Sequence, residues 1–441
     1  LASPAREWQP LLAEPLRGQA LEVAAQVAGH FRDPNHIFTI AQQTSQQTGT
    51  DPLAGTFGFY GGAFPCACFA RYFPEQGWEK ITHQYLDPAR IWAPTFSHPG
   101  LFGGISGLAL VMELISAGGR RYRKTLAELH QRFPALIQEA GWRQKEPGEV
   151  AENDYDAIRG AASTLAYLLS VPAPGEEVQA AIALLLDYLI HLAGSDPASR
   201  RERWYIAQKH IVLEENRRQY PQGYYNCSLS HGIPGPLAAL SLAWLAGYRV
   251  PGLREALVFL SDWIVQHAIT DNWGINWPGM IPLQASHRAE DWRQLPPTRA
   301  AWCYGAPGIA RALWLAGHAL NEEKLCQVAL EALEAVLRRP VAKRDIDAPT
   351  LCHGIAGLLA ICLRFAHETE SQTIREHIPL LTRQILEHYN PAFPLGFRNL
   401  ENREQWIDET GWLTGAAGTA LVLLAAALPV EPVWDRALLL S

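Results

Sequence analysis

The hydrophobic residues of this chain fall into two kinds of segment. Segments rich in leucine and alanine, such as residues 237–243, are apolar on nearly every side, which is typical of a helix in a protein interior. Other segments, such as residues 322–338 and 374–389, carry charge on one side only, which is typical of a helix that covers a core. Residues 11–31 also fit a helix. The pattern predicts an all-α protein with an inner and an outer layer of helices.

A glycine-containing tract comes before the apolar segments along most of the chain. The first glycines of six such tracts are Gly104, Gly160, Gly232, Gly305, Gly354 and Gly415. Their spacing leaves room for one helical hairpin per tract. Glycine lets backbone segments approach closely, and the first N–H groups of a helix have no partner within it. We therefore expect an α/α toroid of about six or seven repeats, with every tract at the same end of the ring.

Two segments break this rhythm. Residues 195–228 include a stretch, 203–213, whose alternating character permits a short strand. Residues 270–298 show little periodicity, but they contain three tryptophans, which argues against disorder. We interpret residues 1–441 as a single toroid domain, with residues 195–228 as a small inserted segment.

Composition narrows the classes of function. The chain has 441 residues, of which 48% are hydrophobic and 18% charged, and its formal net charge is −7. An acidic balance of this kind argues against a nucleic-acid binder. Seven cysteines are too few for a disulfide framework, which favours a reducing cytoplasm. The longest apolar run, residues 420–428, is far shorter than the roughly 20 residues that cross a bilayer. We expect neither a transmembrane segment nor a signal peptide.

The candidate chemistry lies in the last residues before three of the glycine tracts. Cys303 and Cys352 each come two residues before the first glycine of their tract, and His353 and His231 come one residue before theirs. Equivalent positions of neighbouring repeats should meet at one end of the ring. Cysteine and histidine are the ligands that zinc prefers, and three protein ligands leave one coordination position for a substrate. The shared register of these four residues favours one Zn²⁺ per chain, and the two stretches around Cys303 and around Cys352-His353 offer it two thiols and an imidazole.

Two charged residues stand near the same end of the ring. Asp156 lies four residues before Gly160, and Arg299 lies four before Cys303. Each has a plain structural explanation, because aspartate often begins a helix and arginine is common on surfaces. The other cysteines lack the register and are expected to pack in the core: Cys66, Cys68, Cys227, Cys326 and Cys362.

With these residues the chain resembles the lanthionine synthetase C family, the cyclases of class I lantibiotic biosynthesis. The matching motifs, within residues 101–428, are Ser230-His231-Gly232-x-x-Gly235, Arg299-x-x-Trp302-Cys303-Tyr304-Gly305 and Cys352-His353-Gly354-x-x-Gly357. The resemblance implies a toroid with zinc on Cys303, Cys352 and His353. It also implies that His231 and Asp156 are catalytic, that Arg299, Trp302 and Tyr304 surround the site, and that residues 195–228 hold a small peptide-binding subdomain. Ser163, Pro234 and Pro307 depart from the family's glycine tracts.

The resemblance further implies a reaction and its partners. Such cyclases add a peptide cysteine thiol to a dehydroalanine or dehydrobutyrine of the same dehydrated precursor, forming (methyl)lanthionine rings. His231 is then the expected general acid, oriented by Asp156, and Arg299 or Tyr304 would stabilise the enolate oxygen. A dehydratase and an ABC exporter are the expected partners, and the expected location is the cytoplasm, with membrane association through those partners.

Two other classes of function fit parts of the sequence. Another toroid enzyme, such as a thiol prenyltransferase or a glycosidase, would share the fold. A glycosidase needs two carboxylates beside a cleft, whereas the tracts supply only Asp156. A non-catalytic, zinc-containing scaffold that binds glutathione or a peptide would share the fold and the ligands but would not consume a dehydrated residue.

Overall fold

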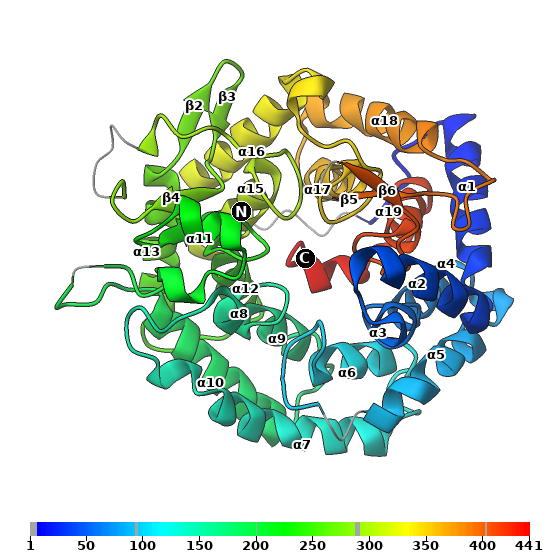
Figure 1. Ribbon diagram of the computed structural model, residues 1–441, viewed down its shortest axis with the longest axis horizontal. Helices are drawn as coiled ribbons and strands as arrows, with labels where there is room; N and C mark the ends of the chain where they lie inside the picture. The colour runs from blue at the N-terminus through cyan, green and yellow to red at the C-terminus, as the bar shows by residue number, and fades with distance from the viewer. Residues whose placement is uncertain (1–6, 93–95, 200, 287–291, 402–403) are drawn as a thin grey trace.

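The computed structural model describes residues 7–92, 96–199, 201–286, 292–401 and 404–441. Within them, seven helices form a closed inner ring, in which each contacts the next and the last contacts the first. They are α4 (Ala63–Tyr72), α6 (Ile105–Leu114), α9 (Ala161–Leu168), α12 (Pro234–Leu245), α15 (Ala306–Leu320), α17 (Ile355–Glu368) and α19 (Ala416–Ala427). The α/α toroid predicted from the sequence is confirmed (Figure 1).

A second layer of helices surrounds this ring (Figure 1). It contains α1 (Leu16–His30), α5 (Trp78–Trp92), α7 (Arg123–Ala140), α10 (Glu176–Leu192), α13 (Leu253–Gln266), α16 (Glu323–Arg338) and α18 (Gln372–Glu387). The two layers differ as the hydrophobic pattern predicts. Every residue of α19 is buried, whereas α16 buries one face that includes Leu333 and Val336. A helix that is apolar all round can be stable in water only when protein covers all of its sides.

The N-terminal segment closes the outer layer. The predicted helix over residues 11–31 is α1, which packs against the last inner helix, α19. The Trp8 indole donates to the carbonyl of Ala425 at 2.8 Å, and Arg17 Nε donates to the carbonyl of Ala427 at 2.8 Å. These bonds join the beginning of the chain to its last repeat.

All the inner helices begin at one end of the ring, which we call the glycine rim. There the residues two positions before the first glycines are joined by backbone hydrogen bonds. Ser230 N donates to the carbonyl of Cys303 at 3.2 Å, Cys303 N to Cys352 at 3.1 Å, and Cys352 N to Leu413 at 2.8 Å. The register inferred from the sequence therefore corresponds to real contacts between equivalent residues of adjacent repeats.

A seventh tract, Gly61-Gly62, precedes α4 and was not recognised in the sequence. It extends the ladder of backbone hydrogen bonds at the rim with a shift of one residue, since Trp412 N donates to the carbonyl of Tyr60 at 3.1 Å. Its helix begins Ala63-Phe64-Pro65. Pro65 occupies the position that holds a second glycine, or Ser163, in the other tracts. The departures noted in the other tracts are also accommodated. The Ser163 hydroxyl donates to the carbonyl of Gly160 at 2.8 Å.

Pro234 and Pro307 lie in the first turns of α12 and α15. The N–H that proline lacks would have no helical partner at that position. Both prolines are therefore compatible with the turn geometry of their tracts.

Gly305 shows why the tracts need glycine. Its φ is +98°, and a Cβ atom placed there would lie 1.9 Å from the carbonyl oxygen of Arg299. We expect Gly305→Ala to lower the free energy of unfolding by about 3 kcal/mol, from overpacking and a left-handed backbone together. Gly247 is a matched control with φ of +97° and nothing within 4 Å of its Cβ position, so Gly247→Ala should cost about 1 kcal/mol. Denaturant midpoints of the two variants test the difference, and equal losses would contradict it.

The two interruptions of the repeat pack on each other. Strand β1 (Tyr224–Asn226), from the first, pairs antiparallel with β4 (Met280–Pro282), from the second. Strands β2 (Ile269–Asp271) and β3 (Gly274–Asn276) form a hairpin. The strand anticipated within residues 203–213 is instead a single bridge between Ile206 and Tyr224 beside a 3-10 turn, Gln208–His210. A further hairpin joins β5 (Asn399–Glu401) to β6 (Gln405–Ile407).

Four further α-helices are described: α2 (Pro34–Thr48) and the short helices α3 (Pro52–Thr56), α8 (Glu152–Tyr155) and α11 (Glu214–Gln219). The C-terminal segment, with a 3-10 turn at Trp434–Leu438, crosses the middle of the ring (Figure 1). It is held by Arg364, which binds Asp435 at 2.5 Å. In the described part of the chain no helix has both the length and the apolarity needed to span a bilayer.

Candidate functional site at the glycine rim

Two thiols meet at the glycine rim. The side chains of Cys303 and Cys352 hydrogen bond to each other, and the pKa of Cys303 is lowered mainly by that bond, against the effect of burial and with help from the charge of Arg299. The remaining five cysteines are different. Burial raises the pKa of Cys362 to about 12 and that of Cys326 to about 11. The thiolate is the reactive and metal-binding form, and the surroundings of Cys303 favour it, whereas those of Cys326 and Cys362 do not.

All seven cysteines are free thiols, as the sequence predicts. Four of the five without the register are buried, and Cys326 is half-buried. Their packing role is therefore consistent with their positions inside helices or beside them.

His353 follows Cys352 in the chain, and one of its ring nitrogens is held by a hydrogen bond. Its Nε2 lies 3.0 Å from Oδ1 of Asn399, a buried residue of β5. Burial lowers the pKa of His353, and the nearby charge of Arg299 lowers it further. The imidazole is therefore neutral at pH 7. Metal-binding histidines commonly use one nitrogen for the metal and give the other to a hydrogen-bond partner, as Asn399 provides here.

The donor set suits zinc in its chemistry. Among the residues that the structure describes, no three His, Cys, Asp or Glu side chains are arranged as a group that could hold a metal ion. Nevertheless the lowered pKa of Cys303, which favours its thiolate, and the neutral imidazole of His353 suit the forms in which these groups bind zinc. Arg299 is close enough to influence both Cys303 and His353, so the three residues share one environment.

A histidine and an aspartate from the two preceding tracts form a second pair. Nδ1 of His231 lies 2.8 Å from Oδ2 of Asp156, whose side chain is fully buried. The other carboxylate oxygen, Oδ1, accepts backbone N–H groups from Arg159 and Gly160, both at 2.7 Å. Asp156 is therefore rigidly placed. It leaves Nε2 of His231 available, on a side chain that is 36% exposed.

The surroundings of His231 favour its charged form. Burial alone would lower the pKa of His231, but the hydrogen bond and charge of Asp156, with the charge of Glu152, outweigh burial and raise it. An imidazolium stabilised in this way can serve as a general acid near neutral pH. Tyr304 lies near His231, with 6.5 Å between the centroids of the two rings.

Trp302 has a different place from its neighbours. Its indole is fully buried, and Nε1 donates to the carbonyl of Leu438 at 2.9 Å. It thus anchors the C-terminal segment from inside the ring, and we leave it out of the catalytic set.

Sequence reasoning missed a polar network beside Tyr304. Asn226 Nδ2 donates to Oε1 of Glu152 at 2.6 Å and to the Tyr304 hydroxyl at 3.2 Å, and the Tyr224 hydroxyl donates to the same Glu152 oxygen at 2.9 Å. Glu152 lies one helical turn before Asp156, and this spacing was its only signal. Nothing in the sequence marks Asn226.

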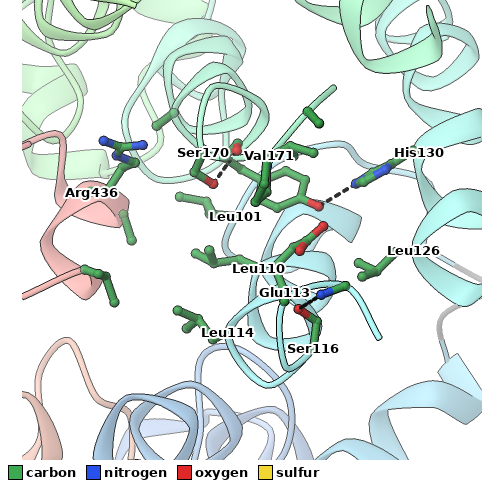
Figure 2. A pocket seen from close by; sticks show the side chains of 18 of the residues that line it. Leu101, Leu110, Glu113, Leu114, Ser116, Leu126, His130, Ser170, Val171 and Arg436 are labelled. Atoms are coloured by element: carbon green, nitrogen blue, oxygen red, sulfur yellow. Dashed lines mark hydrogen bonds between the residues drawn. The ribbon is translucent and has the colours of Figure 1, made fainter. Parts of the chain in front are cut away.

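A large cavity lies elsewhere in the described part of the chain. It has a volume of about 890 Å³ and lies between α6, α7, the end of α9 and the C-terminal segment. Figure 2 shows Leu110, Leu126 and Val171 around Glu113 and His130. None of the residues predicted for the site lines this cavity. The predicted site residues lie instead at or near the starts of the inner helices, at the glycine rim.

Comparison with known proteins agrees with this geometry. The model of the lanthionine synthetase C-like protein family matches residues 55–439, which is most of the chain. The chain belongs to the lanthionine synthetase C-like family. Its relatives include the nisin biosynthesis protein NisC of Lactococcus lactis subsp. lactis, 26% identical over 348 residues, or 77% of each chain. The solved structure of a nisin cyclase superposes with a TM-score of 0.75 at 22% identity, covering 92% of this chain and 97% of the other. Family membership and fold thus agree with the resemblance of the three motifs.

Proposed function

We propose that this protein is a lantibiotic cyclase that adds peptide cysteine thiols to dehydroalanine or dehydrobutyrine. One observation carries the proposal: the paired thiols of Cys303 and Cys352 share the glycine rim with a histidine that a buried aspartate holds in place. Membership of the lanthionine synthetase C-like family supports it, as do the names of the relatives, a nisin biosynthesis protein and a nisin cyclase.

One Zn²⁺ per chain is part of the proposal, with Cys303, Cys352 and His353 as its ligands. The pKa of a cysteine thiol is ordinarily about 8.5, and bound zinc lowers the pKa of a thiol that it contacts. The chain's own part is to supply these ligands in their binding forms and to hold Nε2 of His353 on Asn399. Arg299 contributes a positive charge beside them.

His231 handles the proton in the proposed reaction. When the substrate sulfur bonds to the β-carbon, the electrons of the double bond move onto the α-carbon and its carbonyl oxygen. The enolate then needs a proton at the α-carbon, which Nε2 of His231 supplies. Asp156 keeps Nδ1 engaged and stabilises the positive charge until transfer. The sulfur loses its proton to water and the α-carbon gains one from His231, which takes a proton back from water, so the mass of the peptide does not change.

The proposed substrate is a dehydrated precursor peptide. Residues 195–228 are the proposed contact for it, because their strand β1 carries Asn226 to the Tyr304 hydroxyl at the rim. A dehydratase and an ABC exporter are proposed as partners. The proposed location of this protein is the cytoplasm, with membrane association through those partners. Free thiols at the site require the reducing conditions of that compartment.

The test incubates the protein with a dehydrated, cysteine-containing precursor and then alkylates the remaining thiols. Cyclisation predicts fewer alkyl groups per peptide at unchanged mass before alkylation. Binding without loss of thiols would favour the scaffold function. A mass increase that depends on a prenyl donor would indicate a thiol prenyltransferase.

The proposal also predicts a pH dependence. A raised pKa means that His231 stays protonated to a higher pH than an ordinary histidine, so kcat should fall as the pH rises through that pKa. Asp156→Asn removes the charge that raises the pKa, and burial then lowers it. The falling limb of the profile of kcat against pH should therefore move to lower pH. An unmoved limb would mean that His231 is not the group that titrates.

A further inference from the structure

We propose that Glu152 and Asn226 position the Tyr304 hydroxyl as a hydrogen-bond donor to the enolate oxygen of the reacting peptide. The proposal rests on the cyclase function. It assigns to Glu152 and Asn226, which lie outside the family motifs, a role that the sequence did not indicate. It also decides between Arg299 and Tyr304 as the group that stabilises the enolate.

The first step is the orientation of the Asn226 amide. Its Oδ1 accepts the backbone N–H of Ser228 at 2.9 Å, so the other end of the amide must be the NH₂ group. The two hydrogens of that group are directed to Oε1 of Glu152 at 2.6 Å and to the Tyr304 hydroxyl at 3.2 Å. Because Asn226 is fully buried, its amide has no solvent with which to exchange these partners.

Glu152 fixes this orientation. Two donors converge on its Oε1, the Asn226 amide and the Tyr224 hydroxyl at 2.9 Å. A carboxyl oxygen that receives two donors is an acceptor, and a reversed Asn226 amide would place two oxygens against each other. Asn226 and Tyr224 both belong to β1, so the strand from the first interruption carries the network to the rim.

The last step concerns the hydrogen of Tyr304 itself. Its oxygen lies 3.2 Å from the Asn226 amide nitrogen, which can only donate. The Tyr304 oxygen therefore accepts in this bond, and its own hydrogen is not used there. The hydroxyl hydrogen of Tyr304 is left for a donated bond.

This donor is in the right place for the proposed reaction. The ring of Tyr304 lies beside that of His231, with 6.5 Å between the centroids. His231 delivers a proton to the α-carbon, while Tyr304 keeps its proton and shares it with the oxygen two bonds away. A fixed donor at a developing oxyanion needs no rearrangement during the reaction, and removal of one such donor typically costs about 100-fold or more in kcat.

The test exchanges the carboxylate and the amide at positions 152 and 226 while keeping the size of both side chains. In the double variant E152Q/N226D, the new carboxylate at position 226 can still accept the N–H of Ser228, but it can no longer donate to Tyr304 and instead draws the tyrosine hydrogen toward itself. We expect kcat for thiol consumption to fall about 100-fold, as in Tyr304→Phe, with KM within about twofold of the wild type. Adding Tyr304→Phe to E152Q/N226D should cause no further loss, because the donor is already withdrawn.

Matched controls separate this role from a structural one. Tyr248→Phe removes a hydroxyl that bonds Gln179 on the exposed outer layer, and it should leave kcat and KM unchanged. Zinc content and melting temperature of E152Q/N226D should match the wild type. A double variant with wild-type kcat would overturn the proposal, as would a triple variant that loses a further tenfold. If the wild-type protein itself consumes no thiols, the cyclase function fails and this inference fails with it.

Discussion

Cys303→Ala should abolish ring formation and zinc binding together. The substitution removes one of two thiols that hydrogen bond to each other, and it also removes the thiol whose pKa the site lowers. With one thiol and one imidazole left, the site holds too few ligands for zinc, and the substrate thiol loses its activation. We expect thiol consumption to fall more than about 1,000-fold, and bound zinc, measured by elemental analysis, to fall from one per chain to near zero.

The other cysteines supply the control for this prediction. Cys326→Ala changes a half-buried thiol of the outer layer, far from the ladder at the rim, and should keep both zinc and activity. Cys352→Ala should behave as Cys303→Ala does. A zinc-free variant that forms rings at the wild-type rate would show that the thiols serve another purpose.

The fold could be predicted from the sequence because the tracts obey a strict steric rule. In the tracts that have a second glycine, this residue lies against the backbone of its own turn. A Cβ at Gly357 would lie 2.1 Å from the carbonyl oxygen of Leu351, and one at Gly418 would lie 2.1 Å from that of Trp412. Such contacts leave no alternative residue without a shift of the backbone. The positions of the glycines therefore indicate where each inner helix begins. They also indicate the register of Cys303, Cys352 and His231.

The features of the fold and the site that could not be predicted from the sequence are those to which this steric rule does not apply. The tract at Gly61-Gly62 continues with Pro65, so it lacks the repeated second glycine although it extends the ladder. Asn399 and Asn226 reach the site from short strands, and their partners His353 and Tyr304 lie 46 and 78 residues away. Side chains that meet through tertiary packing of irregular segments leave no periodic signal.

The geometry divides the rim between two tasks. The positive charge of Arg299 lies close enough to Cys303 to favour its thiolate. Asp156 and Glu152, both before Gly160, favour a protonated imidazole at His231 in the next tract. In the proposed reaction the first pair of tracts would serve the nucleophile and the second the acid. Groups of opposite character can coexist because each has its own charged neighbours.

His231→Ala should therefore separate catalysis from metal binding. His231 lies in a different tract from Cys303, Cys352 and His353, and its ring is held by Asp156, so its loss should leave zinc at one per chain. Without the acid that protonates the α-carbon, kcat for thiol consumption should fall about 1,000-fold, within the range for lost general acid catalysis. Elemental analysis and the alkylation assay on the same preparation measure both quantities. Loss of zinc in this variant would place His231 among the ligands, and full activity would assign the proton to another group.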